Sequence, residues 1–114
     1  MAERTVRTRD EVIFGTPSVF SDLGYTKTEE RQTKLQLAYA ITKIVEDRTL
    51  TQAAAAELLG INQPKISALL RYKLEGFSVE RLMTFLTSLD RDVSIVIKKK
   101  PRARSAGRIN VIAT

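Results

Sequence analysis

The sequence predicts an all-α fold, in which a bundle of short helices is followed by a short β-strand. Between residues 28 and 89, apolar residues recur at helical spacing, and Ser, Thr or Asn stands where each helix would begin. Hydrophobic residues make up 43% of the 114-residue chain and aromatic residues only 6%, so we expect an aliphatic core. A β-branched run over residues 92–98 departs from helical spacing and predicts the strand.

Composition excludes several classes of function. The chain has no Cys and no His, which removes disulfides, thiolate nucleophiles, zinc fingers and histidine-based acid–base catalysis. No glycine-rich phosphate loop or metal-ligand spacing is found, and Glu57, Glu75 and Glu80 fall on solvated helix faces. We therefore expect neither an enzyme nor a cofactor, and no small-molecule substrate. No apolar run approaches the ~18–20 residues of a membrane span, and residues 1–12 lack the apolar region of a signal peptide.

The net charge of +6 lies entirely near the C-terminal end. Residues 1–28 carry four basic and four acidic residues, and residues 29–90 carry eight of each. Residues 91–114 carry seven basic residues and a single acid, Asp92. A neutral body with a basic tail is typical of proteins that bind nucleic acid. The alternative is a solvated tail that keeps the chain soluble.

The chain divides into an N-terminal arm (residues 1–27), a helical domain (28–90) and a C-terminal strand with a basic tail (91–114). Glycine and proline interrupt the arm, and one helical turn is predicted over residues 16–24. The apolar side of this turn comprises Val19, Phe20 and Leu23. This side either docks on the chain's own domain or holds a partner protein.

Residues 28–48 predict a long amphipathic helix. Thr28 can cap it, and Glu29 and Glu30 lie in the first turn, where the helix dipole favours acids. Arg48 lies at the C-terminal end of this helix, where the helix dipole favours cations. The apolar stripe comprises Leu37, Ala38, Ile41, Ile44 and Val45. We expect this stripe to be core rather than a binding site.

Residues 51–71 predict two short helices joined by a tight turn. The first spans residues 52–59, begins at the cap residue Thr51 and ends at Gly60. The second begins at Asn62 and has proline in its first turn, where a missing N–H costs nothing. Two short helices joined by a glycine-containing turn form a helix-turn-helix.

The side chains of this unit fit that geometry. Ala56 is small enough to let the two helices cross closely, and Ile61 and Ile66 fill the wedge between them. The polar face of the second helix comprises Gln63, Lys65, Ser67, Ala68 and Arg71. Residues 62–74 contain three basic residues and no acid. Such a face is wide enough for a DNA major groove.

Ser78 caps a last helix, whose apolar stripe comprises Val79, Leu82, Met83, Leu86 and Leu89. In the strand predicted beyond it, Val93, Ile95 and Ile97 alternate onto one face. A strand beside a helical bundle needs a partner. The same strand of a second subunit would provide one by symmetry, so these three residues are predicted to hold a homodimer. The alternative is a hairpin with residues 109–112 of the same chain.

Residues 51–67 (TQAAAAELLGINQPKIS) resemble the helix-turn-helix of the XRE family, the Cro/C1-type phage-repressor regulators. The resemblance implies a five-helix, lambda-repressor-like DNA-binding bundle. Residues 76–82 (GFSVERL) and 89–93 (LDRDV) are similar to HigA-type antitoxins and their solitary regulator relatives. Together these likenesses cover about residues 16–98.

Five residues on the second helix are candidates for DNA binding. Gln63 can pair bidentately with adenine, and Ala68, one turn on beside Ser67, is small enough to meet a thymine methyl. Arg71 either reads guanine or holds a phosphate. Family members often have a polar residue where Pro64 stands, so Pro64 is expected to contribute shape rather than a hydrogen bond.

Three further residues are candidates for phosphate contacts. Gln52 lies at a helix N-terminus, where amides and dipole attract phosphate, and the equivalent family position implies that it holds a backbone oxygen. Lys65 and Lys73 are expected to hold phosphates, which position the protein without reading sequence. The alternative for each is ordinary surface exposure.

Three functions remain open at this point. The first is a homodimeric repressor on a palindromic operator, cytoplasmic and nucleoid-associated. The second is an antitoxin that holds a RelE/HigB-like ribonuclease through the arm or the first helix and autoregulates its operon. The third is an interaction module that does not bind DNA. An RNA-binding function lacks an aromatic stacking platform.

Overall fold

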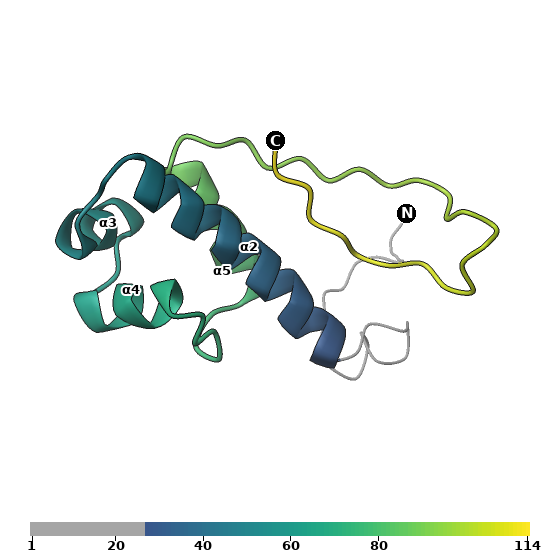
Figure 1. The fold of residues 1–114 in the computed structure, drawn as a ribbon, viewed down its shortest axis with the longest axis horizontal. Coiled ribbons are helices and arrows are strands. Elements are labelled where there is room, and N and C mark those ends of the chain that lie inside the picture. Colours follow the sequence, from purple (N-terminus) through teal and green to yellow (C-terminus); the bar gives the residue numbers. More distant parts are fainter. Residues whose placement is uncertain (1–26) are drawn as a thin grey trace, which may run out of the picture. The chain divides into compact units, whose positions relative to one another are not determined.

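The computed structural model describes residues 27–114 (Figure 1). Within them lie four helices and no strand: α2 (Lys27–Asp47), α3 (Gln52–Leu59), α4 (Gln63–Leu70) and α5 (Val79–Ser88). The all-helical fold is thereby confirmed over these residues. A fifth helix was expected from the family resemblance, and the single turn over residues 16–24 lies outside the described residues. No helix in the described part of the chain is long and apolar enough to cross a membrane.

Contacts between residues divide the chain into two compact units. Of the described residues, 31–99 and 109–114 belong to one unit, and 27–30 and 100–108 belong to the other. The first unit contains nearly all of the four helices and the hydrophobic core. In the second, residues 100–108 form a basic segment with four basic residues and no acid.

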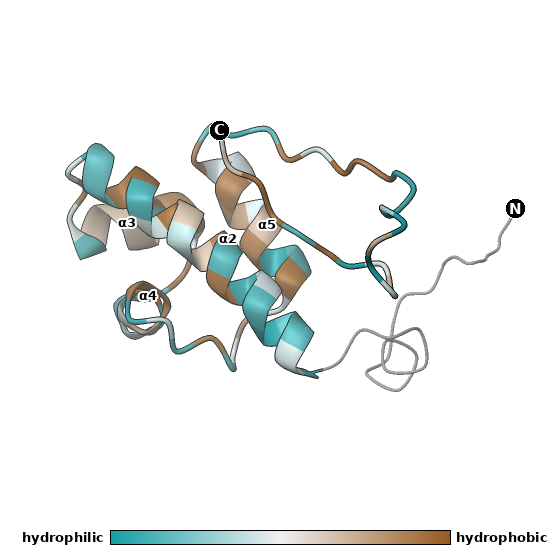
Figure 2. Cartoon of the chain, turned by 45° about the vertical axis from the view of Figure 1, so that its right-hand side comes forward, coloured by the Kyte–Doolittle hydropathy of each residue, from teal (hydrophilic) through white to brown (hydrophobic). Residues whose placement is uncertain are grey.

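One aliphatic core joins the four helices. The stripe predicted on α2 is confirmed, since all five of its apolar residues are buried. The largest fully buried side chains are Ile41, Ile66, Leu69, Leu74, Leu82 and Leu89. In Figure 2 hydrophobic and hydrophilic residues share the surfaces of α2 and α5, as expected for amphipathic helices. The helices are stabilised because their apolar stripes pack against one another in a shared core.

Two phenylalanines also belong to the core, although they were not among the residues predicted to be buried. Phe77 and Phe85 are both buried, with ring centroids 5.9 Å apart and an interplanar angle of 75°. Such an edge-to-face pair is favourable beyond its buried area. Val79 and Met83, which were predicted to lie in the core stripe of α5, are only half-buried at its margin.

Side-chain caps begin three of the helices as predicted. The side-chain oxygen of Thr51 accepts from the N–H of Ala54 at 3.1 Å, and that of Asn62 accepts from Lys65 at 2.9 Å. Ser78 does the same for the N–H three residues on at 3.0 Å. The cap predicted at Thr28 is wrong, because α2 already includes the preceding residue and Thr28 lies within its first turn.

The described helices share one way of ending, with a left-handed residue just beyond the helix. These residues are Thr49 (φ 50°), Gly60 (69°), Tyr72 (62°) and Asp90 (64°). In each case the next N–H bonds to the carbonyl five residues back, from Leu50 to Val45, Ile61 to Ala56, Lys73 to Ala68 and Arg91 to Leu86, at 2.9–3.0 Å. Only one of the four is glycine. Asp adopts this conformation more readily than most residues, but Thr49 and Tyr72 do not, so the surrounding packing must impose it on them.

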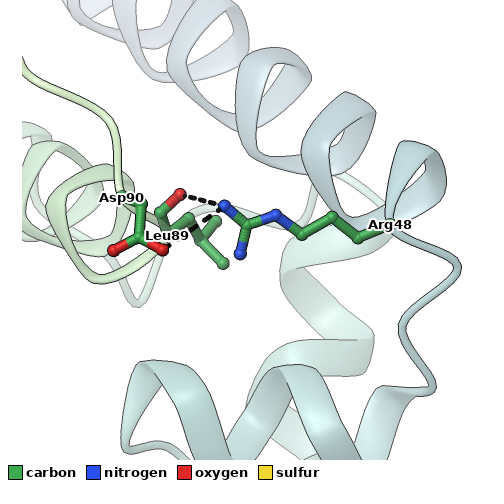
Figure 3. Close-up of polar contacts among 3 residues, drawn as sticks. All are labelled: Arg48, Leu89 and Asp90. Carbon is green, nitrogen blue, oxygen red and sulfur yellow. Dashed lines mark hydrogen bonds and ion pairs between the residues drawn. The ribbon is translucent and has the colours of Figure 1, made fainter.

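Arg48 links the C-terminal ends of α2 and α5 (Figure 3). Its Nη2 donates to the carbonyl oxygen of Leu89 at 2.6 Å and lies 3.7 Å from Oδ2 of Asp90. The guanidinium therefore satisfies a carbonyl that α5 leaves without a partner at its end.

The strand predicted over residues 92–98 is not formed in the single chain, nor is the one over 109–112. A strand needs a neighbour for its backbone groups, and these two segments do not pair as a hairpin. The C-terminal segment contacts α2 instead. Gln36 accepts from the N–H of Val111 at 3.3 Å and donates to the side chain of Asn110 at 3.4 Å.

Candidate nucleic-acid interface

Helices α3 and α4 form a helix-turn-helix, and Figure 1 shows them as neighbours joined by a short turn. The turn comprises residues 60–62, and Gly60 provides its left-handed backbone. Ala55 and Ala56 are both buried, which allows the two helices to approach closely. As predicted, Ile66 is fully buried between the helices, while Ile61 packs against the core from a half-buried position.

The exposed side of α4 carries the residues predicted to contact bases. Because Ile66 and Leu69 anchor the helix in the core, the opposite side faces solvent. Gln63, Ser67 and Arg71 recur every four residues, so their side chains share one side of the helix. Gln63, Pro64 and Arg71 are exposed, and Ser67 and Ala68 are half-buried.

Lys65 is placed differently from its neighbours. Its Nζ lies 5.9 Å from the centroid of the Phe77 ring, within the range of a cation–π contact. Phe77 lies in the connection between α4 and α5 and is itself buried. This contact holds Lys65 toward that connection. Lys73, on the same connection, is exposed.

Phe77 is a residue of this site that the sequence analysis missed. It directly precedes the cap Ser78, and Leu82 follows that cap by four residues; both Phe77 and Leu82 belong to the core. This is the spacing of a hydrophobic staple, in which the residue before the cap packs on the fourth residue of the helix. Recognition of that staple would have predicted that Phe77 is buried.

Ion pairing distinguishes α2 from α4. Ion pairs join Arg31 to Glu75, Lys43 to Asp47 and Arg48 to Asp90, at 3.7–4.0 Å. Each of these cations lies on α2 or directly after it. Glu75, the first acid after residues 62–74, is engaged by Arg31. Within the described residues, no carboxylate lies within ion-pair distance of Arg71 or Lys73, so the positive charge around α4 is not locally neutralised.

The N-terminus of α3 adds backbone donors to this surface. Gln52 is the first residue of the helix and is exposed. The cap Thr51 uses its side-chain oxygen for the N–H of Ala54 and its carbonyl for that of Ala55. The N–H groups of the first helical turn that Thr51 leaves free favour an anion.

Comparisons with known proteins agree with this geometry. The model of a family described as "helix-turn-helix domain" matches residues 19–98, which include all four helices. A solved structure described as an XRE-family transcriptional regulator is 67% identical to this chain, with a TM-score of 0.73. The match covers 76% of this chain and 98% of that chain. This chain belongs to the XRE-type helix-turn-helix family of transcriptional regulators. A search of curated proteins found no match.

Membership of the XRE-type family confirms the resemblance seen in residues 51–67. It also explains why the small residues of α3 and the left-handed Gly60 occur together, since a helix-turn-helix requires both. The geometry brings the predicted residues of α4, together with Gln52 and Lys73, onto exposed or half-buried positions of α3, α4 and the following connection. Their individual contacts with DNA remain predictions.

Proposed function

We propose that this XRE-type regulator is a repressor that binds a palindromic operator in double-stranded DNA as a homodimer. The observation that carries the proposal is the solvent-facing side of α4. Gln63, Ser67 and Arg71 form one stripe there, and the opposite side of the helix is buried in the core. No acid occurs in residues 62–74. A rigid helix with short polar side chains and uncompensated positive charge suits a major groove.

The residues divide into two roles. Gln63 reads adenine through its carboxamide, and Ala68 meets a thymine methyl beside Ser67. Arg71 contacts guanine or a phosphate at the end of the helix, while Pro64 shapes its first turn. Gln52, Lys65 and Lys73 hold phosphates and set the register of the protein on the duplex. Such a protein acts at the chromosome, in the cytoplasm.

Dimerisation is proposed from the exposed apolar residues near the C-terminus. The large hydrophobic residues that are exposed include Val93, Ile95, Val96, Ile97, Ile109 and Ile112, with Ile95 at 76% and Ile97 at 92% exposure. Soluble monomers rarely expose so many together. Pairing of Val93, Ile95 and Ile97 with the same segment of a second copy would cover them and satisfy their backbone groups.

A gel shift with the DNA upstream of the protein's own gene tests the proposal. Wild type should bind this fragment far more tightly than an unrelated duplex of equal length. The double variant Gln52→Ala/Arg71→Ala should bind it at least tenfold more weakly, with its melting temperature within a few degrees of wild type. Equal binding of both fragments by wild type would contradict the proposal. Ile95→Lys should shift the protein toward monomer in light scattering, because it places like charges across the two-fold axis.

A second candidate function is supported by an apolar groove beside α2. Leu35, Tyr39 and Ala40 of α2 line it with Tyr72, Val111 and Ala113, around a volume of about 580 Å³. Tyr39 is 59% exposed. An open apolar groove on a helix suits a protein partner. This favours the antitoxin alternative, in which the chain neutralises a RelE/HigB-like ribonuclease and autoregulates its operon.

Co-expression with any small reading frame next to the gene separates the two candidates. An antitoxin should rescue growth from that neighbour and co-purify with it, and Tyr39→Glu should abolish rescue without changing operator binding. A regulator without a toxin should show neither effect. The control Lys43→Glu changes an exposed residue of α2 outside the groove.

A further inference from the structure

Residues 100–108, here called the basic turn, contain cations that belong neither to the hydrophobic core nor to the proposed DNA-binding side of α4. It carries four basic residues, Lys100, Arg102, Arg104 and Arg108, and no acid. In sequence it follows Lys98 and Lys99, and no acid occurs after Asp92. So much charge of one sign repels itself unless an anion binds to it.

Hydrogen bonds within the turn hold its backbone in a defined conformation. The N–H of Arg104 donates to the carbonyl of Pro101 at 3.2 Å, which closes a four-residue turn. The Nζ of Lys100 donates to the carbonyl of Arg104 at 2.8 Å, and Nη1 of Arg104 donates to Ala106 at 3.4 Å. Lys100 and Arg104 therefore shape the turn.

The other two cations are available to a ligand. Arg102 and Arg108 are exposed, and within the described residues neither has an ion pair or hydrogen bond. Between them lie Arg104 and the small residues Ala103, Ser105, Ala106 and Gly107, which would let the backbone approach a phosphate closely. By contrast, Arg31, Lys43 and Arg48 are each engaged by a carboxylate.

We propose that the basic turn is a second DNA contact, which binds backbone phosphates of the duplex without reading its sequence. This inference rests on the proposed operator-binding function and adds an electrostatic element separate from α4. Guanidinium groups bind phosphate oxygens bidentately, and the turn presents two that are unpaired. Duplex phosphates recur regularly along the backbone, so the two free guanidinium groups can each engage a phosphate. Such contacts strengthen operator and unrelated DNA alike.

A salt series on the full-length chain tests the basic turn. The variant Arg102→Gln/Arg108→Gln is compared with Arg31→Gln/Lys43→Gln, which removes the same charge from cations that are already ion-paired. Binding to the operator fragment and to an unrelated duplex is measured from about 50 to 200 mM salt. Each lost phosphate contact lowers the slope of log K against log salt by about 0.9. Loss of two phosphate contacts in the basic-turn variant should therefore lower the magnitude of this slope by about 1.8 per chain, whereas the control should leave the slope almost unchanged.

The ratio of operator to unrelated binding should stay within about twofold of wild type, because phosphate contacts carry no sequence information. A slope equal to that of the control would overturn the proposal. So would a loss of slope seen with single-stranded RNA but not with duplex DNA. Failure of operator recognition by α4 is a distinct result: wild type would then fail to prefer the operator, whereas the unrelated duplex would still report the slope of the basic turn.

Discussion

Replacing Gly60 with Ala tests whether the turn of the helix-turn-helix depends on its left-handed backbone. Gly60 has φ 69° and ψ 32°, and its N–H and that of Ile61 bond back to carbonyls of α3 at 3.2 and 3.0 Å. A Cβ built at this position would meet nothing within 4 Å. The cost of the substitution is therefore one of backbone conformation and not of steric contact.

The magnitude follows from two opposing terms. A left-handed conformation costs a residue with a Cβ about 1–2 kcal/mol. Replacing Gly with Ala also restricts the unfolded chain, which returns about 0.4–1 kcal/mol. We expect a net loss of about 1 kcal/mol, equivalent to a fall of about 4–8 °C in melting temperature for a domain of this size.

Thermal and urea unfolding followed by circular dichroism measure this loss. Gly76→Ala is the matched control, because a Cβ there would also meet nothing within 4 Å and its φ lies outside the left-handed range. The control should be neutral or slightly stabilising. Equal stability of the two variants would refute the reasoning, as would a loss of several kcal/mol, which would indicate a steric clash.

Five further substitutions, in three tests, address other contacts of the fold. Thr49→Gly should stabilise the protein by about 0.5–1 kcal/mol in urea unfolding, because it removes a β-branched residue from φ 50°; a destabilised variant would contradict this. Asn62→Ala should cost about 1 kcal/mol through loss of the cap on α4, whereas Asn62→Ser should retain most of the stability in thermal melts. Arg48→Ala should cost about 1 kcal/mol through the carbonyl of Leu89, whereas Asp90→Asn should cost under about 0.5 kcal/mol because Asp90 is exposed; the reverse order in denaturant unfolding would argue against this.

Local sequence signals predicted the four helices and the beginnings of three of them. Thr51, Asn62 and Ser78 act as caps where they were expected, because a cap depends on residues only three positions apart. The same holds for Gly60, whose lack of a side chain marks the end of α3. The core stripe of α2 followed from periodicity alone.

Features that depend on distant contacts were not predictable in the same way. Thr49 and Tyr72 adopt left-handed backbones although neither residue type favours that conformation. Arg48 was expected only to complement a helix dipole, but it contacts α5 across 41 positions of sequence. Packing between helices determines these features.

The strand predicted over residues 92–98 is not formed in the single chain, for a related reason. Alternation of Val93, Ile95 and Ile97 describes a segment able to form a strand, but a strand also needs a neighbour. For the α4 site, helical periodicity predicted which side faces solvent: Gln63, Lys65 and Arg71 are exposed there, and Ser67 and Ala68 are half-buried. The position of Lys65 over Phe77 depends on tertiary packing and could not be predicted.

The most direct test of the account is whether Gln63 reads a base. Affinities of wild type and Gln63→Ala are measured at one salt concentration on the operator and on an unrelated duplex. Gln32→Ala, at an exposed glutamine of α2, is the control. We expect Gln63→Ala to lose about 1–3 kcal/mol on the operator and almost nothing on the unrelated duplex. Equal losses on both duplexes, or no loss on either, would contradict the assignment of α4 as the helix that reads DNA.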